Sequence, residues 1–157
     1  MTAEEEIKQA SSILADYLKQ KHLRKTHERF KLLEVVYAQP SHFSADDLME
    51  LALREFHVSR ATVYNTLELL VACRLVVKHQ FDQQRTEYEK ITSSATHHHR
   101  ICISCGAVSE FSDQKIRRAI QYRKFSAFVP THYTLYLYGY CKKCAKKLKQ
   151  RGANVAQ

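Results

Sequence analysis

Residues 97–105 read HHHRICISC, three consecutive histidines that one arginine separates from a Cys-x-x-Cys pair. A second such pair, Cys141 and Cys144, follows after 35 intervening residues. Imidazole and thiolate groups are ligands that zinc, iron and nickel prefer in proteins. An expression tag explains the histidines poorly, because they lie in the middle of the chain and number only three. We therefore expect the second half of the chain to be organised around bound metal.

The four paired cysteines have the spacing of a closed tetrahedral zinc site. They are Cys102, Cys105, Cys141 and Cys144. Gly106 follows the first pair and Gly139 precedes the second, so the backbone can turn around an ion at both places. Zinc has no redox chemistry, and its binding at such a site adds directly to the folding free energy. The fifth cysteine, Cys73, falls in a predicted helix and is expected to be a small buried apolar residue.

The composition fits one ordinary domain or two small ones, with 157 residues and 45% hydrophobic content. Lys and Arg outnumber Asp and Glu 25 to 16, which favours a polyanionic partner if a recognition motif accompanies it. The N-terminus, MTAEEEIKQA, lacks the pattern of a signal peptide, and no apolar run approaches the ~18 residues that span a bilayer. We expect a cytoplasmic protein with no membrane partner, where thiolates stay available for metal.

The first half of the chain has the pattern of a winged helix-turn-helix. Apolar spacing predicts four helices, over 4–21, 26–37, 44–55 and 59–72. Ser44 and Asp47 form a capping box for the third helix, and Ser59 caps the fourth. Two strands, 75–80 and 85–89, supply the wing. Short helix pairs are common, but the wing and the basic composition strengthen this prediction, which places the fourth helix in a DNA major groove.

The bend ITSSAT, residues 91–96, separates this unit from the rest. We predict a DNA-binding domain at 1–91, a hinge at 92–96, and a dimerisation and metal-binding domain with a basic tail at 97–157. The fold class is therefore α+β: an N-terminal winged helix-turn-helix domain and a C-terminal α/β dimerisation domain with a structural zinc site.

In the second half we expect strands at 99–103 and 107–111, then a helix that Ser112 caps and that ends near Lys124. The next strand, residues 131–140, is apolar on both faces, which predicts a central position in its sheet or a place at a subunit interface. A short basic helix follows Cys141. Its charges, within 142–151, are expected to be solvated surface, and the tail GANVAQ to be loose.

Strand alternation puts His97 and His99 on one face and His98 on the other. Carboxylates and a further imidazole could converge on the face of His97 and His99. The candidates are His42 before the third helix, Glu89 at the end of the wing, and Glu110 on the neighbouring strand. Surface histidines are ordinary, so this grouping alone does not define a site.

Four stretches together make the chain resemble the ferric uptake regulator family of bacterial metal-dependent repressors. They are SHFSADDL (41–48), SRATVYNTLELL (59–70), HHHRICISCGAVSEFSD (97–113) and HYTLYLYGYCKKC (132–144). The resemblance covers nearly the whole chain. It implies a homodimeric transcriptional repressor, not an enzyme, that binds an A/T-rich palindromic operator in double-stranded DNA and controls metal homeostasis, foremost that of iron.

The resemblance also implies a regulatory metal site formed by His42, Glu89, His97, His99 and Glu110. Three imidazoles and two carboxylates suit the octahedral preference of iron(II) or manganese(II) better than the four-coordinate preference of zinc. Peroxide-sensing members use aspartates where Glu89 and Glu110 stand, which favours metal sensing here. Zinc sensing stays open, and haem binding is a weaker alternative. A metal that joins both halves would favour one hinge angle and so couple metal binding to operator binding.

Many family members have a further metal site near the dimerisation core. The corresponding residues here are Thr96, His98, Arg117 and Tyr133, with His132 displaced by one position. Only His98 can ligate a metal without rearrangement. We predict that this site is absent or badly weakened.

Tyr64 and Asn65 are the expected base-reading residues, because a tyrosine ring packs on thymine methyls and an asparagine amide pairs with adenine. The expected phosphate or positioning contacts are Ser59, Arg60 and Thr62. Family members reach an A/T-rich minor groove with a basic residue before the second helix, and Arg24 matches it best.

Two other classes of function compete with the repressor. A metal-dependent hydrolase would use the His/Glu cluster to activate water, but the chain has no His-Glu-x-x-His helix and only three glycines to shape a catalytic pocket. A metal buffer or zinc carrier would use the same ligands without DNA, which leaves Tyr64 and Asn65 unexplained.

Overall fold

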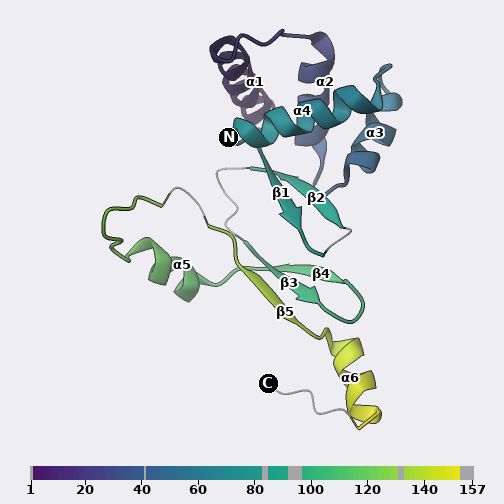
Figure 1. The fold of residues 1–157 in the computed structure, drawn as a ribbon, viewed down its shortest axis with the longest axis vertical. Coiled ribbons are helices and arrows are strands. Elements are labelled where there is room, and N and C mark those ends of the chain that lie inside the picture. Colours follow the sequence, from purple (N-terminus) through teal and green to yellow (C-terminus); the bar gives the residue numbers. More distant parts are fainter. Residues whose placement is uncertain (1, 41, 83–84, 92–96, 131–132, 153–157) are drawn as a thin grey trace. The chain divides into compact units, whose positions relative to one another are not determined.

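The structure, a computed structural model, describes residues 2–40, 42–82, 85–91, 97–130 and 133–152. The chain forms two compact units, Met1–Ser93 and Ser94–Gln157 (Figure 1). The predicted hinge, residues 92–96, lies outside the described residues, as does the tail 153–157. Within the described ranges, no helix combines the length and the apolar character that crossing a membrane requires.

The first unit contains four helices and a two-stranded wing. The helices are α1 (Ala3–Gln20), α2 (His27–Ala38), α3 (Ala45–Leu53) and α4 (Arg60–Ala72), and the strands are β1 (Val76–Gln80) and β2 (Thr86–Lys90). Ser44 begins α3 with the predicted capping box, since its hydroxyl accepts from the amide of Asp47 at 3.1 Å. Ser59 begins α4, where its hydroxyl accepts from the amide of Thr62 at 3.1 Å. The helix-turn-helix and wing are confirmed.

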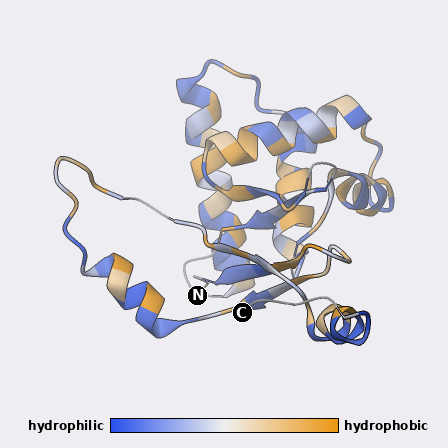
Figure 2. Cartoon of the chain, turned by 60° about the horizontal axis from the view of Figure 1, so that its bottom comes forward, coloured by the Kyte–Doolittle hydropathy of each residue, from blue (hydrophilic) through white to orange (hydrophobic). Residues whose placement is uncertain are grey.

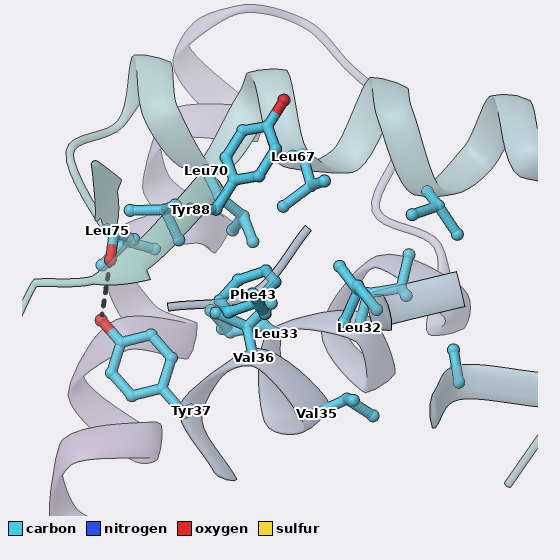
Figure 3. Packing of buried hydrophobic residues seen from close by; sticks show 14 of the residues in the cluster. Leu32, Leu33, Val35, Val36, Tyr37, Phe43, Leu67, Leu70, Leu75 and Tyr88 are labelled. Atoms are coloured by element: carbon cyan, nitrogen blue, oxygen red, sulfur yellow. Dashed lines mark hydrogen bonds between the residues drawn. The ribbon is translucent and has the colours of Figure 1, made fainter. Parts of the chain in front are cut away.

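A single apolar core holds these helices and the wing together (Figure 3). Its fully buried side chains include Leu14 and Leu18 of α1, Leu33 of α2, and Leu67 and Leu70 of α4. Burying a leucine side chain contributes about 1.5–3 kcal/mol, so α1 is an integral part of the unit rather than an appendage. This core fixes the outward face of α4 relative to the wing.

Phe43 connects the loop before α3 to strand β2. Its ring stacks on Tyr88 with the ring centroids 6.1 Å apart, and both residues are buried (Figure 3). Two backbone hydrogen bonds join them as well, with Phe43 N–H donating to Tyr88 at 3.0 Å and Tyr88 N–H donating back at 2.8 Å. Because Phe43 and Tyr88 are joined, the residues next to them, His42 and Glu89, lie close together.

The second unit is a three-stranded sheet with two helices. Its strands are β3 (His98–Cys102), β4 (Val108–Phe111) and β5 (Tyr136–Gly139), in the order β4-β3-β5, and its helices are α5 (Gln114–Gln121) and α6 (Lys142–Gln150). Strand β3 pairs antiparallel with β4 and parallel with β5. The predicted α+β class is confirmed, with the winged unit first and the α/β unit second.

Strand β5 differs from its prediction. The expected strand at 131–140 is reduced to Tyr136–Gly139, and residues 131–132 lie outside the described residues. Among the described strands β5 is at the edge of its sheet, so the first predicted alternative, a central position in the sheet, is wrong. The second alternative, a place at a subunit interface, stays a prediction. Leu137 and Tyr138 keep 45% and 58% of their surface exposed. Alternation of apolar residues cannot distinguish a strand that is central in its own sheet from an edge strand that a partner covers.

Helix α5 also begins and ends elsewhere than predicted. Asp113, not Ser112, is its N-cap, because the Asp113 carboxylate accepts from the amides of Lys115 at 2.7 Å and Ile116 at 3.2 Å. The helix ends at Gln121 rather than near Lys124. Serine and aspartate are equally good N-caps, so the sequence alone could not choose between the two neighbours.

Candidate metal sites and DNA-reading helix

The four paired cysteines meet at one end of the second unit. Cys102 ends β3, Cys105 lies in the following turn, Cys141 caps α6 and Cys144 lies in its first turn. Their sulfur atoms all lie within 4.8 Å of one another, and those of Cys105 and Cys141 are 3.8 Å apart. Zinc–sulfur bonds of about 2.3 Å in a tetrahedron place the sulfurs about 3.8 Å apart. The cluster therefore suits a structural zinc ion.

The backbone around this cluster prepares it for metal. Gly106 has a φ of 71°, a left-handed conformation that glycine adopts without strain, and its amide donates to the carbonyl of Cys102 at 2.8 Å. This tight turn brings Cys105 back toward Cys102. All four cysteines are free thiols rather than disulfides.

The thiols of the cluster differ in acidity. The Cys141 amide donates to the Cys102 sulfur at 3.3 Å and lowers the pKa of Cys102 to about 6. The Cys144 amide similarly lowers the pKa of Cys141. The Ala107 amide favours the Cys105 thiolate, but the sulfurs of Cys102 and Cys144 outweigh it and raise the pKa of Cys105 to about 11. Metal binds thiolates, so the lowered pKa values of Cys102 and Cys141 favour metal binding.

A second group of ligand-type side chains lies within the first unit, around Glu89. His42 Nε2 is 3.3 Å from Glu89 Oε2, and His79 Nε2 is 3.1 Å from the same oxygen. Two right-angled bonds of about 2.1 Å to one ion place their ligand atoms about 3.0 Å apart. The spacing thus suits neighbouring ligands of an octahedral ion as well as hydrogen bonds.

His79 is a residue that the sequence analysis missed. In the wing, Val77 pairs with Glu89 and His79 with Glu87, so His79 and Glu89 are diagonal neighbours on one face. His79 is 2% exposed, and its ring stacks on Phe81 at 5.3 Å. The register of the two wing strands could have revealed the pair, but a histidine that pairs through a two-strand register has no sequence motif.

The histidine run alternates as predicted. The rings of His97 and His99 are 5.0 Å apart, whereas the His98 ring contacts Phe111 at 5.3 Å. Glu110 stands directly opposite His99 in the antiparallel pairing of β3 and β4, so the two residues share a face. This face of the second unit carries two imidazoles and one carboxylate. Their role as metal ligands stays a prediction.

The residues of the further family site do not gather as a metal site in the part of the chain described. His98 is 1% exposed and packs against the Tyr133 ring at 5.6 Å, and it belongs to no cluster of three or more potential ligands there. Arg117 is exposed on α5. Thr96 and His132 lie outside the described residues, so the predicted weakness of this site stays a prediction.

Helix α4 presents the predicted base-reading residues. Tyr64 is 40% exposed and Asn65 is exposed beside it. The Arg60 guanidinium lies 6.0 Å from the centre of the Tyr64 ring and pairs with Asp46 at 3.0 Å. The hydroxyls of Ser59 and Thr62 contact each other at 2.9 Å, which makes both part of the helix cap.

Two remaining predicted residues lie elsewhere in the first unit. Arg24 is exposed in the segment before α2, and its carbonyl accepts a hydrogen bond from Arg29. Cys73, at the end of α4, is half-buried rather than buried, and its thiol donates to the Leu70 carbonyl at 3.6 Å. Burial raises the pKa of the Cys73 thiol, which keeps it protonated and unreactive.

A winged helix-turn-helix unit, followed by a unit with a tetrathiolate zinc site, defines the class of metal-dependent transcription regulators. The model of the ferric uptake regulator family matches residues 20–138. The ferric uptake regulation protein of Bordetella parapertussis is 33% identical over 132 residues, which cover 82% of this chain and 94% of that protein. The chain therefore belongs to the ferric uptake regulator family.

Two further relatives show how wide this family is. The peroxide operon regulator of Bacillus subtilis is 30% identical over 132 residues, covering 83% of this chain and 90% of that protein. The structure of the Pseudomonas aeruginosa ferric uptake regulator with manganese has a TM-score of 0.68 at 32% identity, covering 82% of this chain and 97% of that one. Family members are DNA-binding transcription regulators rather than enzymes, and they act as dimers. Overall identity alone does not separate iron sensing from peroxide sensing.

Proposed function

We propose that this protein is a homodimeric, DNA-binding repressor that controls metal homeostasis, foremost that of iron, by coupling metal binding to operator binding. The observation that carries the proposal is the convergence of His42 and Glu89, 3.3 Å apart, in the unit whose α4 exposes Tyr64 and Asn65. Ligand-type side chains and DNA-reading side chains thus belong to one compact unit. A metal held by the first can act on the orientation of the second.

The regulatory metal would be held by His42, Glu89, His97, His99 and Glu110. The first two residues belong to the winged unit and the other three to the α/β unit. Three imidazoles and two carboxylates match the ligand preferences of iron(II) and manganese(II). Glutamates rather than aspartates at positions 89 and 110 support metal sensing over peroxide sensing. When bound, the metal would form bonds to ligands from both units.

His79 would act as a positioning residue for this site. When Nε2 carries its proton, it donates to Glu89 Oε2 at 3.1 Å and leaves the second carboxylate oxygen for other bonds. Carboxylates that bind metal are themselves held by hydrogen bonds, and losing such a partner weakens metal binding. The stack of His79 on Phe81 fixes the imidazole that orients Glu89.

Coupling follows from where the ligands lie in the chain. Ligands from two units can all reach one ion only at certain inter-unit angles, so a bound ion lowers the free energy of those angles. In a dimer the same angles set the distance between two α4 helices, and operator half-sites have a fixed spacing. Metal and operator would therefore each strengthen the binding of the other.

Operator recognition would depend on α4. Tyr64 would pack on a thymine methyl, and Asn65 would pair with adenine in the major groove. Ser59, Arg60 and Thr62 would contact or position the backbone, and Arg24 would reach an A/T-rich minor groove.

Dimerisation would use the second unit. Strand β5 leaves one edge unpaired among the described strands, and the exposed apolar side chains beside it need a cover. These include Leu137 and Tyr138, with 45% and 58% of their surface exposed.

The experiment is a titration of an A/T-rich palindromic duplex by fluorescence anisotropy, first in chelated buffer and then with iron(II), manganese(II) or zinc. We expect tight binding only with metal, and we expect iron(II) and manganese(II) each to produce it. A His97→Ala/His99→Ala variant should lose the response to metal. His22→Asn, a change of an exposed histidine in a turn that asparagine tolerates, is the matched control and should keep it.

Two outcomes would contradict the proposal. Equal binding with and without metal would leave a DNA reader without a metal switch. Absence of specific binding under every condition would instead favour a metal carrier.

A further inference from the structure

The excess of positive over negative charge in this protein does not belong to the winged unit. Met1–Ser93 contains 13 of the 25 Lys and Arg residues and 14 of the 16 Asp and Glu residues, a formal charge of −1. Ser94–Gln157 contains the other 12 basic residues and only two acidic ones, Glu110 and Asp113, a formal charge of +10. The expectation that basic composition supports the winged helix therefore needs revision, because the excess charge belongs to the other unit.

The surroundings of Tyr64 confirm that the winged unit is electrostatically mixed. The pocket beside this residue is lined by Lys78 and Arg85 but also by five carboxylates, Asp46, Asp47, Glu68, Asp82 and Glu87. Sequence-independent affinity for DNA comes almost entirely from cations that replace counterions on phosphates. The winged unit has 13 cations, but its 14 carboxylates offset them, which weakens its net attraction for phosphates.

Helix α6 carries five of the twelve basic residues of the second unit, all on one face. Lys142, Lys143, Lys146, Lys147 and Lys149 are all exposed, and at 100° per residue they cover a contiguous arc of about 160°. The opposite arc carries Cys144, Ala145 and Leu148, which are half-buried. Hydrophilic residues predominate along the helix, with a smaller hydrophobic share (Figure 2).

This arrangement of lysines destabilises the helix that carries it. Lys142 and Lys143 lie at the N-terminus, where the helix dipole disfavours cations, and each has another lysine four residues on. A helix of nine residues is also too short to be stable alone, since about 12–15 are needed. The lysines are therefore not explained by the stability of α6.

The zinc site compensates for this weakness. Cys141 caps α6 and Cys144 lies in its first turn, so two of the four zinc ligands fix the helix start. Four thiolates and one Zn²⁺ carry a net charge of −2, which offsets part of the six positive charges in 142–151. Four positive charges remain for an external partner.

We propose that α6 is a second DNA-binding surface, which contacts the phosphate backbone of duplex DNA without reading its sequence and is held in shape by the zinc site. Contiguous lysines on a short, rigid helix match the spaced charges of a duplex, and lysine binds phosphate as a point charge. The proposal does not depend on operator recognition by α4. It gives the protein affinity for any duplex, and so a means of searching DNA by sliding.

The test uses the full-length, zinc-loaded protein and a 30-base-pair duplex without a palindrome. A Lys143→Gln/Lys146→Gln/Lys147→Gln variant is compared with Lys8→Gln/Lys19→Gln/Lys21→Gln, which removes the same charge from exposed positions on and just after α1. Each lost phosphate contact should flatten the plot of log affinity against log salt by about 0.9. We expect the α6 variant to lose about 2 to 3 from the slope and to bind roughly tenfold more weakly at low salt.

The control should keep the wild-type slope. Equal slopes for the α6 variant and the wild type would overturn the proposal. So would an α6 variant that loses binding to polyglutamate of similar charge but keeps its affinity for the duplex, because α6 would then serve an acidic protein. Circular dichroism and zinc content confirm that each variant is folded and loaded.

Discussion

Glu89 is the residue on which the account of the regulatory site depends. One of its oxygens lies within 3.3 Å of two imidazole nitrogens, those of His42 and His79. His42 lies next to Phe43, and Glu89 next to Tyr88, so the Phe43–Tyr88 stack in the core determines their closeness. A packing contact thus brings together two of the five proposed ligands, His42 and Glu89, before any metal binds.

The positioning role of His79 predicts a specific defect. His79→Ala should weaken binding of the regulatory metal about 10–100-fold, because Glu89 loses the donor that orients it. His79→Gln keeps an N–H donor and should recover part of the affinity. Competition against a chelating dye measures both variants, with His22→Asn as the control.

The same titration separates positioning from general damage. The zinc content of the cysteine cluster and the thermal unfolding of the His79→Gln variant should stay near those of the wild type. A metal affinity that is unchanged in His79→Ala would show that Glu89 needs no such partner.

At the scale of single elements, much was predictable from sequence. Helix starts at Ser44 and Ser59 follow from side chains that accept from nearby amides, which is a local property. The two cysteine pairs are also local, since each needs only a turn. The cluster they form was predictable because zinc chemistry demands four ligands.

Elements that depend on distant neighbours were predicted less well. Strand β5 is shorter than its apolar pattern, because pairing with β3 includes only Tyr136–Gly139. His79 becomes part of a site only through the register of β1 and β2. The start of α5 at Asp113 shows a third limit of prediction from sequence. Ser112 and Asp113 are equally good N-caps, and only the three-dimensional structure shows which of them caps the helix.

The capping box of α3 gives a stability prediction. The Ser44 hydroxyl and amide donate to the Asp47 carboxylate at 2.7 and 2.8 Å, which lowers the pKa of Asp47. Ser44→Ala should cost about 1 kcal/mol in the free energy of unfolding by urea. The exposed, mid-helix change Ser12→Ala is the control and should cost nothing.

The pH dependence of that loss has a definite sign. A carboxyl with a lowered pKa in the folded state contributes stability above its unfolded pKa, and this contribution disappears as pH falls through the folded pKa. The difference between wild type and Ser44→Ala should therefore shrink in acid. A difference that grows below pH 4 would contradict this origin.

Helix α6 predicts the effect of zinc removal. Without zinc, nine residues with five exposed lysines should not remain helical. A strong chelator should lower the helical signal in circular dichroism, and hydrogen exchange should locate the loss in 142–150. If those amides stayed protected in the zinc-free protein, the helix would not need the metal.

In the molecule as a whole, the proposed base-reading residues and the excess of positive charge belong to different units. The winged unit carries the proposed base-reading residues with a formal charge of −1, whereas the second unit carries +10. On the two proposals made above, specificity would depend on α4 and its orientation, and general affinity for DNA on α6. A metal that changes only the orientation of α4 could switch operator binding without changing the proposed contact of α6 with DNA.

We propose that binding of the regulatory metal and binding of the operator are coupled. Linkage requires that the operator raise metal affinity by the same factor by which metal raises operator affinity. The measurement is the Kd of iron(II) or manganese(II), obtained anaerobically against a competing chelator, with and without a saturating A/T-rich palindrome. We expect a tighter Kd with the palindrome, equal in factor to the metal effect on DNA binding, and no change with His97→Ala/His99→Ala. A metal Kd that is the same with and without operator would contradict it.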